Sequence, residues 1–223
     1  MASNNPQSSQ QPSVEKLFVV SLPRTATTSF CLAMLEQGFT VAHTAYTQET
    51  FARAKVIADT PVFSDYARLD RLYPDARFVY LERNPDEWLP SIRQLLLRMQ
   101  KNLQRQDGGF NPILKRCYGE VFGQYSEAEL SQDQYLLDCY YQHQQQVVSY
   151  FAERDQDFLR LQANDPLWWQ SVATLIDHPM TPAPFPHVNK GGKVTKWNDL
   201  KHPLKIDSTR NGRSEDLFKT LYR

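Results

Sequence analysis

The run SLPRTATTSF, at residues 21–30, places an arginine beside several hydroxyl side chains: Arg24, Thr25, Thr27, Thr28 and Ser29. A loop between a buried strand and a helix presents free backbone N–H groups to an anion, and the helix dipole adds positive potential. The arginine would add a fixed charge and the hydroxyls further donors. The run therefore predicts an anion site. The alternative is that the hydroxyls only cap the helix and the arginine is incidental.

A second arginine, Arg83, follows the apolar run RFVYLE at residues 77–82, and Ser91 lies eight positions after it. A guanidinium group offers a planar fork to phosphate, and a serine adds one donor. The alternative is the start of a helix with a surface arginine. Either motif alone is weakly specific, whereas the two in this order, each at the end of a strand, indicate a site for two anionic groups.

Two residues are candidate general bases. Asp59, in the run ADTP, lies 24 residues before Arg83. A carboxylate can take the proton of an acceptor hydroxyl within hydrogen-bond reach. The alternative is that Asp59 only caps the turn before Pro61. His43 is the competing base, while His143, on a long helix, is expected to be a packed or surface histidine.

A late glycine-containing loop, PFPHVNKGGK at residues 184–193, carries Lys190, Gly191, Gly192 and Lys193. Glycine lets a backbone approach a phosphate closely. The run is therefore a candidate anion-binding loop, with a flexible surface loop as the alternative.

Apolar runs predict the elements that must position these residues. Strands are expected at 17–21, 40–43, 56–58, 77–82 and 158–161, and helices at 27–37, 66–73, 85–104, 136–154 and 167–176. The helix at 136–154 has an apolar stripe of Leu137, Tyr140, Tyr141, Val148 and Phe151. Core or acceptor-pocket positions are expected for Trp168, Trp169, Tyr140 and Tyr141. Such alternation predicts an α/β fold, a parallel sheet with helices on both faces. Ligands bind beyond the carboxyl ends of such strands, so Arg24, Asp59 and Arg83 should share one rim.

The run Pro23-Arg24-Thr25-Ala26-Thr27-Thr28 resembles the 5′-phosphosulfate loop of sulfotransferases that use 3′-phosphoadenosine 5′-phosphosulfate (PAPS), roughly Pro-Lys/Arg-Ser/Thr-Gly-Thr-Thr. Ala26 stands where the family has glycine. This departure implies that the backbone there needs no positive φ, or that the loop is slightly altered. The familiar nucleotide loop GxxxxGK[ST] is not matched.

The later motifs extend this resemblance. Arg83 and Ser91 are similar to the pair that holds the 3′-phosphate in the family, and Asp59 occupies the place of a catalytic histidine in cytosolic members. Lys190, Gly191 and Lys193 are similar in kind to a basic loop that folds over the 3′-phosphate.

The resemblance covers residues 16–193 and is closest to small, divergent bacterial and fungal-type members. It implies a P-loop-like sulfotransferase fold, a three-layer parallel sheet flanked by helices. It implies PAPS as co-substrate without a metal, and sulfuryl transfer to a hydroxyl or amine of a small-molecule acceptor. Arg24 would stabilise the leaving group, and the residues 24–29 would hold the 5′-phosphate.

Charge and composition bound the class of protein. Lysine plus arginine equals aspartate plus glutamate, 25 against 25, whereas a general nucleic-acid or membrane-surface binder is usually more lopsided. The three cysteines form no CxxC pair, which argues against a disulfide framework or a cysteine zinc site. The polar amino terminus lacks the apolar core of a secretory signal, and no apolar run reaches the ~18 residues of a membrane span. A cytoplasmic protein is expected, and a homodimer is left open.

Three segments are expected: a disordered tail at 1–15, the sulfotransferase domain at 16–193 and a basic segment at 194–223. Residues 190–223 hold nine basic and four acidic side chains. This end is either a solvated tail or a clamp on an anionic ligand.

Two other classes of function remain open from the sequence. A kinase or other P-loop phosphotransferase is one, because Glu82 at the end of an apolar strand is placed like a Walker B acid. A nucleotide-binding protein that kept the fold without catalysis is the other.

Overall fold

The computed structural model of the chain describes residues 15–186, 188 and 197–207. Within them lies a five-stranded parallel sheet in the order β2-β3-β1-β4-β5. Its strands are β1 (Leu17–Val19), β2 (Val41–Ala42), β3 (Val56–Ala58), β4 (Arg77–Glu82) and β5 (Phe158–Gln162). The predicted α/β fold with a parallel sheet is confirmed.

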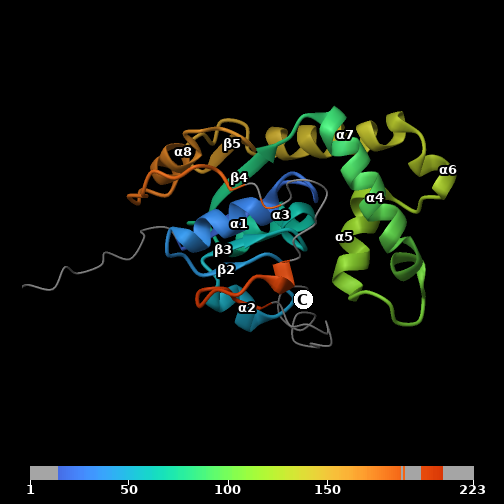
Figure 1. Cartoon of the computed structure of the whole chain (residues 1–223), viewed down its shortest axis with the longest axis horizontal. Helices are drawn as coiled ribbons and strands as arrows, with labels where there is room; N and C mark the ends of the chain where they lie inside the picture. Colours follow the sequence, from blue (N-terminus) through green and yellow to red (C-terminus); the bar gives the residue numbers. More distant parts are fainter. Residues whose placement is uncertain (1–14, 187, 189–196, 208–223) are drawn as a thin grey trace, which may run out of the picture.

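Helices cover both faces of the sheet (Figure 1). They are α1 (Thr27–Glu36), α2 (Gln48–Arg53), α3 (Val62–Leu72), α4 (Pro85–Gln104), α5 (Pro112–Phe122), α6 (Glu127–Leu130), α7 (Asp133–Tyr150) and α8 (Trp168–Leu175). A short 3-10 helix, η2 (Trp197–Asp199), follows. Buried side chains form two clusters, one on each face of the sheet. One cluster includes α3, α4, α5 and α7, and the other includes α1 and α8, so the structure has three layers.

The alternating directions of the side chains along β1 explain why the buried residues form two clusters. Phe18 packs into the cluster with α3 and α7, while Leu17 and Val19 pack into the cluster with α1. Each of the three is at most 3% exposed. A strand buried on both faces reads as a continuous apolar run, which is the pattern that predicted it.

The ends of α4 follow from its sequence. The Asn84 side chain accepts a hydrogen bond from the Asp86 amide, and Pro85 occupies the first helical position, where its missing N–H costs nothing. The predicted span 85–104 is confirmed. In contrast, α3 begins earlier than predicted, at Val62, and α2, α5 and α6 were not predicted.

The buried face of α7 agrees with the predicted one in part. An apolar stripe through Leu137, Tyr140, Tyr141, Val148 and Phe151 was expected. Tyr140 and Phe151 are buried, whereas Tyr141 is 51% exposed. The buried side chains within α7 are Leu136, Tyr140, His143 and Val147, so Leu136 and Val147 take the places expected of Leu137 and Val148. Both flanks of this aromatic-rich helix are partly apolar, which makes the exact buried positions hard to predict from periodicity.

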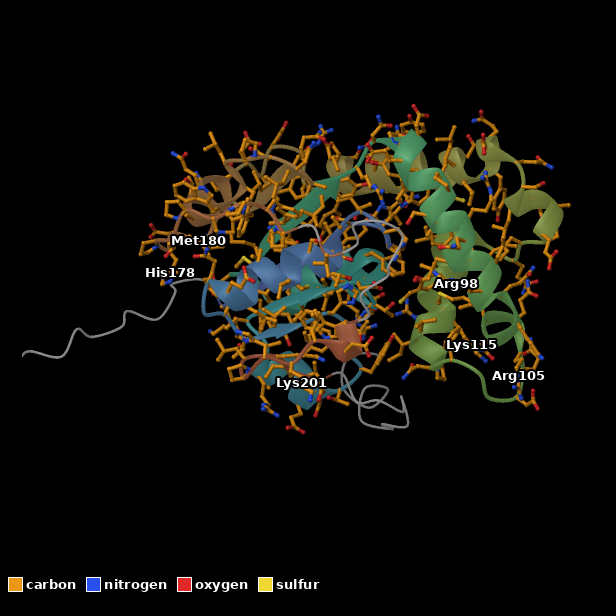
Figure 2. All side chains as sticks on the ribbon, viewed as in Figure 1. Arg98, Arg105, Lys115, His178, Met180 and Lys201 are labelled. Atoms are coloured by element: carbon orange, nitrogen blue, oxygen red, sulfur yellow. The ribbon has the colours of Figure 1, made fainter. Side chains whose placement is uncertain are left out.

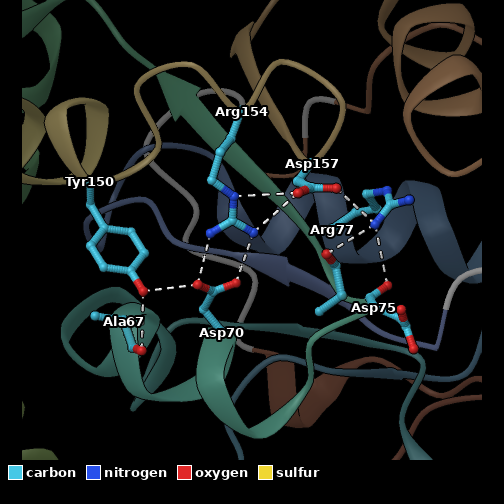
Figure 3. A network of polar contacts seen from close by, with 8 residues as sticks. Ala67, Asp70, Asp75, Arg77, Tyr150, Arg154 and Asp157 are labelled. Atoms are coloured by element: carbon cyan, nitrogen blue, oxygen red, sulfur yellow. Dashed lines mark hydrogen bonds and ion pairs between the residues drawn. The ribbon is translucent and has the colours of Figure 1, made fainter.

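A polar network joins α3 and α7 to the amino ends of β4 and β5 (Figure 3). Arg154 contacts Asp70 with two parallel hydrogen bonds, of 2.7 and 2.9 Å, and Asp157 at 3.1 Å. The Tyr150 hydroxyl donates to Asp70 at 2.8 Å, and Arg77 pairs with Asp157 at 2.9 Å. A bidentate arginine–carboxylate pair fixes orientation as well as distance, so this network sets how α7 leads into β5.

Candidate functional site

The loop between β1 and α1 reaches the helix through two residues with left-handed backbone. Arg24 and Ala26 both have φ 72°. The expectation that residue 26 needs no positive φ is therefore wrong, and an alanine adopts here the conformation that glycine adopts more easily. Ala26 is the N-cap of α1, and no described side chain caps that helix end. Capping by the threonines was one alternative, and the described residues do not bear it out.

The start of α1 has backbone amides without a capping side chain among the described residues. The first N–H groups of a helix have no partner within the helix, and at α1 no described side chain replaces one. Thr25 is turned away, because its hydroxyl donates to the Leu22 carbonyl at 2.8 Å and its side chain is fully buried. The start of α1 thus presents amides and the hydroxyls of Thr27 and Thr28 to an anion.

Neighbouring elements hold the loop in place. The Trp88 indole N–H, on α4, donates to the Pro23 carbonyl at 2.9 Å. The Ser21 hydroxyl accepts a hydrogen bond from the Leu81 amide of β4. Both bonds tie the loop to β4 and α4, the elements that carry the second arginine motif.

The two predicted arginine motifs meet at this loop. Arg24 donates from Nε to the Ser91 hydroxyl at 2.8 Å, across 67 positions of sequence. Arg83 donates from Nη1 to the Arg24 carbonyl at 2.9 Å, and its Nε lies 3.7 Å from Glu87. The predicted common rim is therefore present. The hydrogen bond from Arg24 to Ser91 was not predicted from the sequence.

Positive charge concentrates around Arg24. Burial lowers the pKa of Arg24 from its usual value, and the charges of Arg98 and Arg83 lower it further. Arg98 comes from α4, the helix that also carries Ser91, and is labelled in Figure 2. Like charges held together create a positive potential that favours a bound anion.

His43 and Asp59 lie beside α1. The His43 Nε2 atom is 3.2 Å from the Thr27 hydroxyl and 3.1 Å from the Thr28 hydroxyl, and its Nδ1 is 3.8 Å from Asp59. Burial lowers the pKa of His43, and the Asp59 charge offsets part of this effect. The lowered pKa favours the neutral form of the His43 imidazole.

Asp59 is held in a left-handed conformation, φ 54°, directly after β3. Its Oδ1 accepts from the Thr60 amide at 2.7 Å and from the Thr60 hydroxyl at 3.1 Å. The expected turn-capping contact is thus present, and it leaves Oδ2 directed towards His43.

The charge of Asp59 also acts on two buried tyrosines, Tyr46 and Tyr118. Burial, followed by the charge of Asp59, raises the pKa of both Tyr46 and Tyr118. Tyr118 comes from α5, so the site lies between the sheet and the helices beyond its carboxyl edge.

The other expected residues divide between core, surface and undescribed parts. Ser29 is 7% exposed, and its hydroxyl accepts from the Val188 amide at 3.5 Å. His143 is packed in the core, as expected, where burial lowers its pKa to about 4. Trp168 and Tyr140 are core residues, whereas Tyr141 is exposed. Lys190, Gly191, Gly192 and Lys193 lie outside the described residues.

Three residues near the site were not predicted from the sequence. Trp88 anchors the loop, Tyr118 faces the Asp59 charge, and Trp197 stacks on His43 with ring centroids 5.6 Å apart. Only Trp88 had a usable signal, because it lies between Arg83 and Ser91. The others reach the site from distant positions through tertiary packing.

Within the described residues, no cluster of histidine, cysteine, aspartate or glutamate is suited to a metal ion, and no helix is long and apolar enough to cross a membrane.

Comparison with known proteins assigns the family. The family model described as "Sulfotransferase domain" matches residues 43–194, more than half of the chain. The match contains His43, Asp59, Arg83 and Ser91, and it begins after the loop that carries Arg24. A search of curated proteins found no match. With its parallel sheet, its open helix start and the family match, the chain belongs to the sulfotransferase domain family, whose members are transferases.

Proposed function

We propose that the protein transfers a sulfuryl group from PAPS to a hydroxyl or amine of a small-molecule acceptor. One observation carries the proposal: Arg24 contacts Ser91 at 2.8 Å while Arg83 contacts the Arg24 carbonyl at 2.9 Å. Two arginines and an open helix start thus converge on one rim of the sheet. A nucleotide with a phosphate at each end of its ribose needs two such anion sites.

Two sets of residues would bind the two phosphate groups of PAPS. The amides at the start of α1, with the hydroxyls of Thr27 and Thr28, would bind the 5′-phosphate. Arg83 and Ser91 would bind the 3′-phosphate, and Arg24 would stabilise charge that develops on the leaving oxygen. Lys190, Gly191 and Lys193 stay candidates for the 3′-phosphate on the sequence alone. The Arg24–Ser91 hydrogen bond supports a shared role, because it joins Ser91 to the residue whose carbonyl accepts a hydrogen bond from Arg83.

Asp59 is the stronger candidate for the general base. Its Oδ1 is occupied by Thr60, whereas Oδ2 lies 3.8 Å from His43, beyond hydrogen-bond range. This oxygen can accept the proton of an acceptor hydroxyl. His43 is the weaker candidate, because its Nε2 contacts Thr27 and Thr28.

When bound, PAPS supplies a sulfuryl group on a good leaving group, its 5′-phosphate. The acceptor oxygen or nitrogen forms a bond to sulfur as the bond from sulfur to the phosphate oxygen breaks. Asp59 takes the acceptor proton, and the products are the sulfated acceptor and 3′,5′-diphosphoadenosine. As in phosphoryl transfer, positioning and charge stabilisation would supply most of the rate.

A kinase is less well supported. A Walker B acid must be free for a magnesium ion, but Glu82 accepts hydrogen bonds from Arg160 at 2.7 Å and from Gln162 at 2.6 Å, both on β5. An ATP-dependent, magnesium-requiring transfer would nevertheless favour this class.

A thermal-shift screen tests the nucleotide, because ligands that bind only the folded state raise its stability. The screen compares 3′,5′-diphosphoadenosine with ADP and with ATP plus magnesium. We expect the 3′,5′-diphosphate to give the largest shift, and an equal or larger shift with ATP would overturn the proposal.

Labelled PAPS then tests catalysis, with a panel of phenols, alcohols, amines and sugars. Tight binding of the diphosphate without transfer to any acceptor would instead support a nucleotide-binding protein that lacks catalysis.

A further inference from the structure

The segment 197–207 is fixed against β2. The Val41 amide donates to the Leu204 carbonyl at 3.1 Å, and the Ile206 amide donates to the Val41 carbonyl at 2.8 Å. Lys205 turns back along its own segment and donates from Nζ to the carbonyls of Trp197, at 2.8 Å, and Leu200, at 2.9 Å. This segment therefore carries Trp197 to a defined place.

Trp197 lies against the imidazole of His43. The two rings stack with centroids 5.6 Å apart and an interplanar angle of 28°. Trp197 is 8% exposed, yet its indole N–H has no hydrogen-bond partner among the described residues. The indole belongs to the buried apolar cluster that includes α1 and α8, stacks on His43 and has the Lys205 ammonium 5.4 Å from its centroid.

The opposite edge of His43 meets the hydroxyls of Thr27 and Thr28, at 3.2 and 3.1 Å. In the tautomer with its proton on Nε2, that one N–H is shared between the two hydroxyl oxygens. Each hydroxyl hydrogen then stays available for an oxygen of a bound anion. Nδ1 is 3.8 Å from Asp59, too far for a hydrogen bond, so this tautomer breaks no contact there.

We propose that Trp197 is a positioning residue of the donor site: by stacking on His43 it holds the imidazole against Thr27 and Thr28, and so orients both hydroxyls towards the 5′-phosphate. The inference rests on the proposed function in one respect, the identity of the bound anion. The carboxyl-terminal segment thereby becomes part of the site, although it lies about 170 positions after the loop in sequence and would contact no ligand itself.

Binding measurements on three variants test the inference. Trp197→Ala removes the stack, whereas Trp197→Phe keeps an aromatic ring and removes only the N–H. Phe39→Ala is the matched control, because Phe39 is also 8% exposed and packs on a histidine, His178, at 5.5 Å. Phe39 follows α1, at the amino end of β2, away from the loop.

The Kd of 3′,5′-diphosphoadenosine, measured by calorimetry, should rise about tenfold in Trp197→Ala, as two oriented donors are weakened. It should stay near the wild-type value in Trp197→Phe and Phe39→Ala. Unchanged affinity in Trp197→Ala would overturn the inference. Equal losses in the Ala and Phe variants would also overturn it, because the N–H would then matter and the stack would not. Trp197→Leu, which keeps apolar volume, replaces the Ala variant if that fails to fold, with the same expected loss.

Imidazole titration by NMR in the nucleotide-free protein separates this inference from the proposed function. The groups that face His43 are Asp59 after β3, the two threonine hydroxyls of α1 and, beyond the indole, the Lys205 ammonium. Burial lowers the pKa of His43, so uncovering the ring in Trp197→Ala should raise it, and Trp197→Phe should leave it low. An unchanged titration in Trp197→Ala overturns the inference. Wild-type protein that does not bind the diphosphate overturns only the proposed function.

Discussion

Replacing Arg83 with alanine separates binding of the 3′-phosphate from support of the loop. In the structure Arg83 donates to the Arg24 carbonyl at 2.9 Å, and its side chain is 30% exposed, so part of the guanidinium can reach a ligand. A charge-assisted hydrogen bond contributes ~1.5–3 kcal/mol. The Kd of 3′,5′-diphosphoadenosine should therefore rise about 10- to 150-fold.

Calorimetry with two nucleotides shows which phosphate group loses affinity in Arg83→Ala. Adenosine 5′-monophosphate lacks the 3′-phosphate and keeps the 5′-phosphate. If Arg83 binds the 3′-phosphate, Arg83→Ala should weaken 3′,5′-diphosphoadenosine and leave the monophosphate within about threefold, because the open amides of α1 are untouched. The preference of the protein for the diphosphate should therefore fall.

Equal weakening of both nucleotides would refute this reasoning. It would mean that Arg83 acts by holding the Arg24 carbonyl and hence the loop. Arg105→Ala is the matched control for loss of one positive charge: Arg105 follows the far end of α4, where its Nε lies 3.6 Å from Asp107 (Figure 2). It should bind both nucleotides as the wild type does.

Three further predictions concern turnover and stability. Arg24→Met should lower kcat by ~10²–10³-fold while the affinity for the donor falls less, because the charge on the leaving group grows in the transition state. Steady-state kinetics with an acceptor from the panel measures kcat, and calorimetry measures the affinity. An unchanged kcat would show that Arg24 does not stabilise the leaving group. Asp59→Asn should lower kcat by ~10²–10⁴-fold and leave the affinity for the diphosphate unchanged. A normal kcat would show that Asp59 is not the general base, and His43 would then be tested. Asp70→Asn should lower the free energy of unfolding by ~1–3 kcal/mol at pH 7 in urea melts. Burial raises the pKa of Asp70, but hydrogen bonds from Arg154 and Tyr150 outweigh burial and lower it. This stabilisation is therefore present above about pH 4 and lost as pH falls further, so a variant equally destabilised at pH 7 and pH 3 would contradict the reasoning.

Local sequence was enough to predict a strand or a helix start where one physical signal dominated. The continuous apolar run at 77–82 is β4, and Asn84 with Pro85 marks the start of α4. The common rim followed from topology, since strands in a parallel sheet end at one edge. The short α2, by contrast, begins at a Thr47 cap in a segment too brief for periodicity to be visible.

The contacts within the site could not be predicted from spacing. The eight-residue interval between Arg83 and Ser91 did not predict the hydrogen bond that Arg24 donates to Ser91. The conformation of Ala26 was also misjudged, because tertiary contacts such as the Trp88–Pro23 hydrogen bond hold the loop in a conformation that alanine by itself disfavours. Side-chain direction at a loop depends on such contacts, which a sequence pattern does not contain.

The backbone pairing between Val41 and the segment around Lys205 also bears on self-association. β2 is the last strand in the sheet order, and the outer edge of such a strand presents unpaired N–H and C=O groups that can recruit a second chain. Here Leu204 and Ile206 occupy both groups of Val41. The segment that delivers Trp197 therefore also closes an edge at which identical molecules would otherwise add strand to strand, so removing it would favour aggregation.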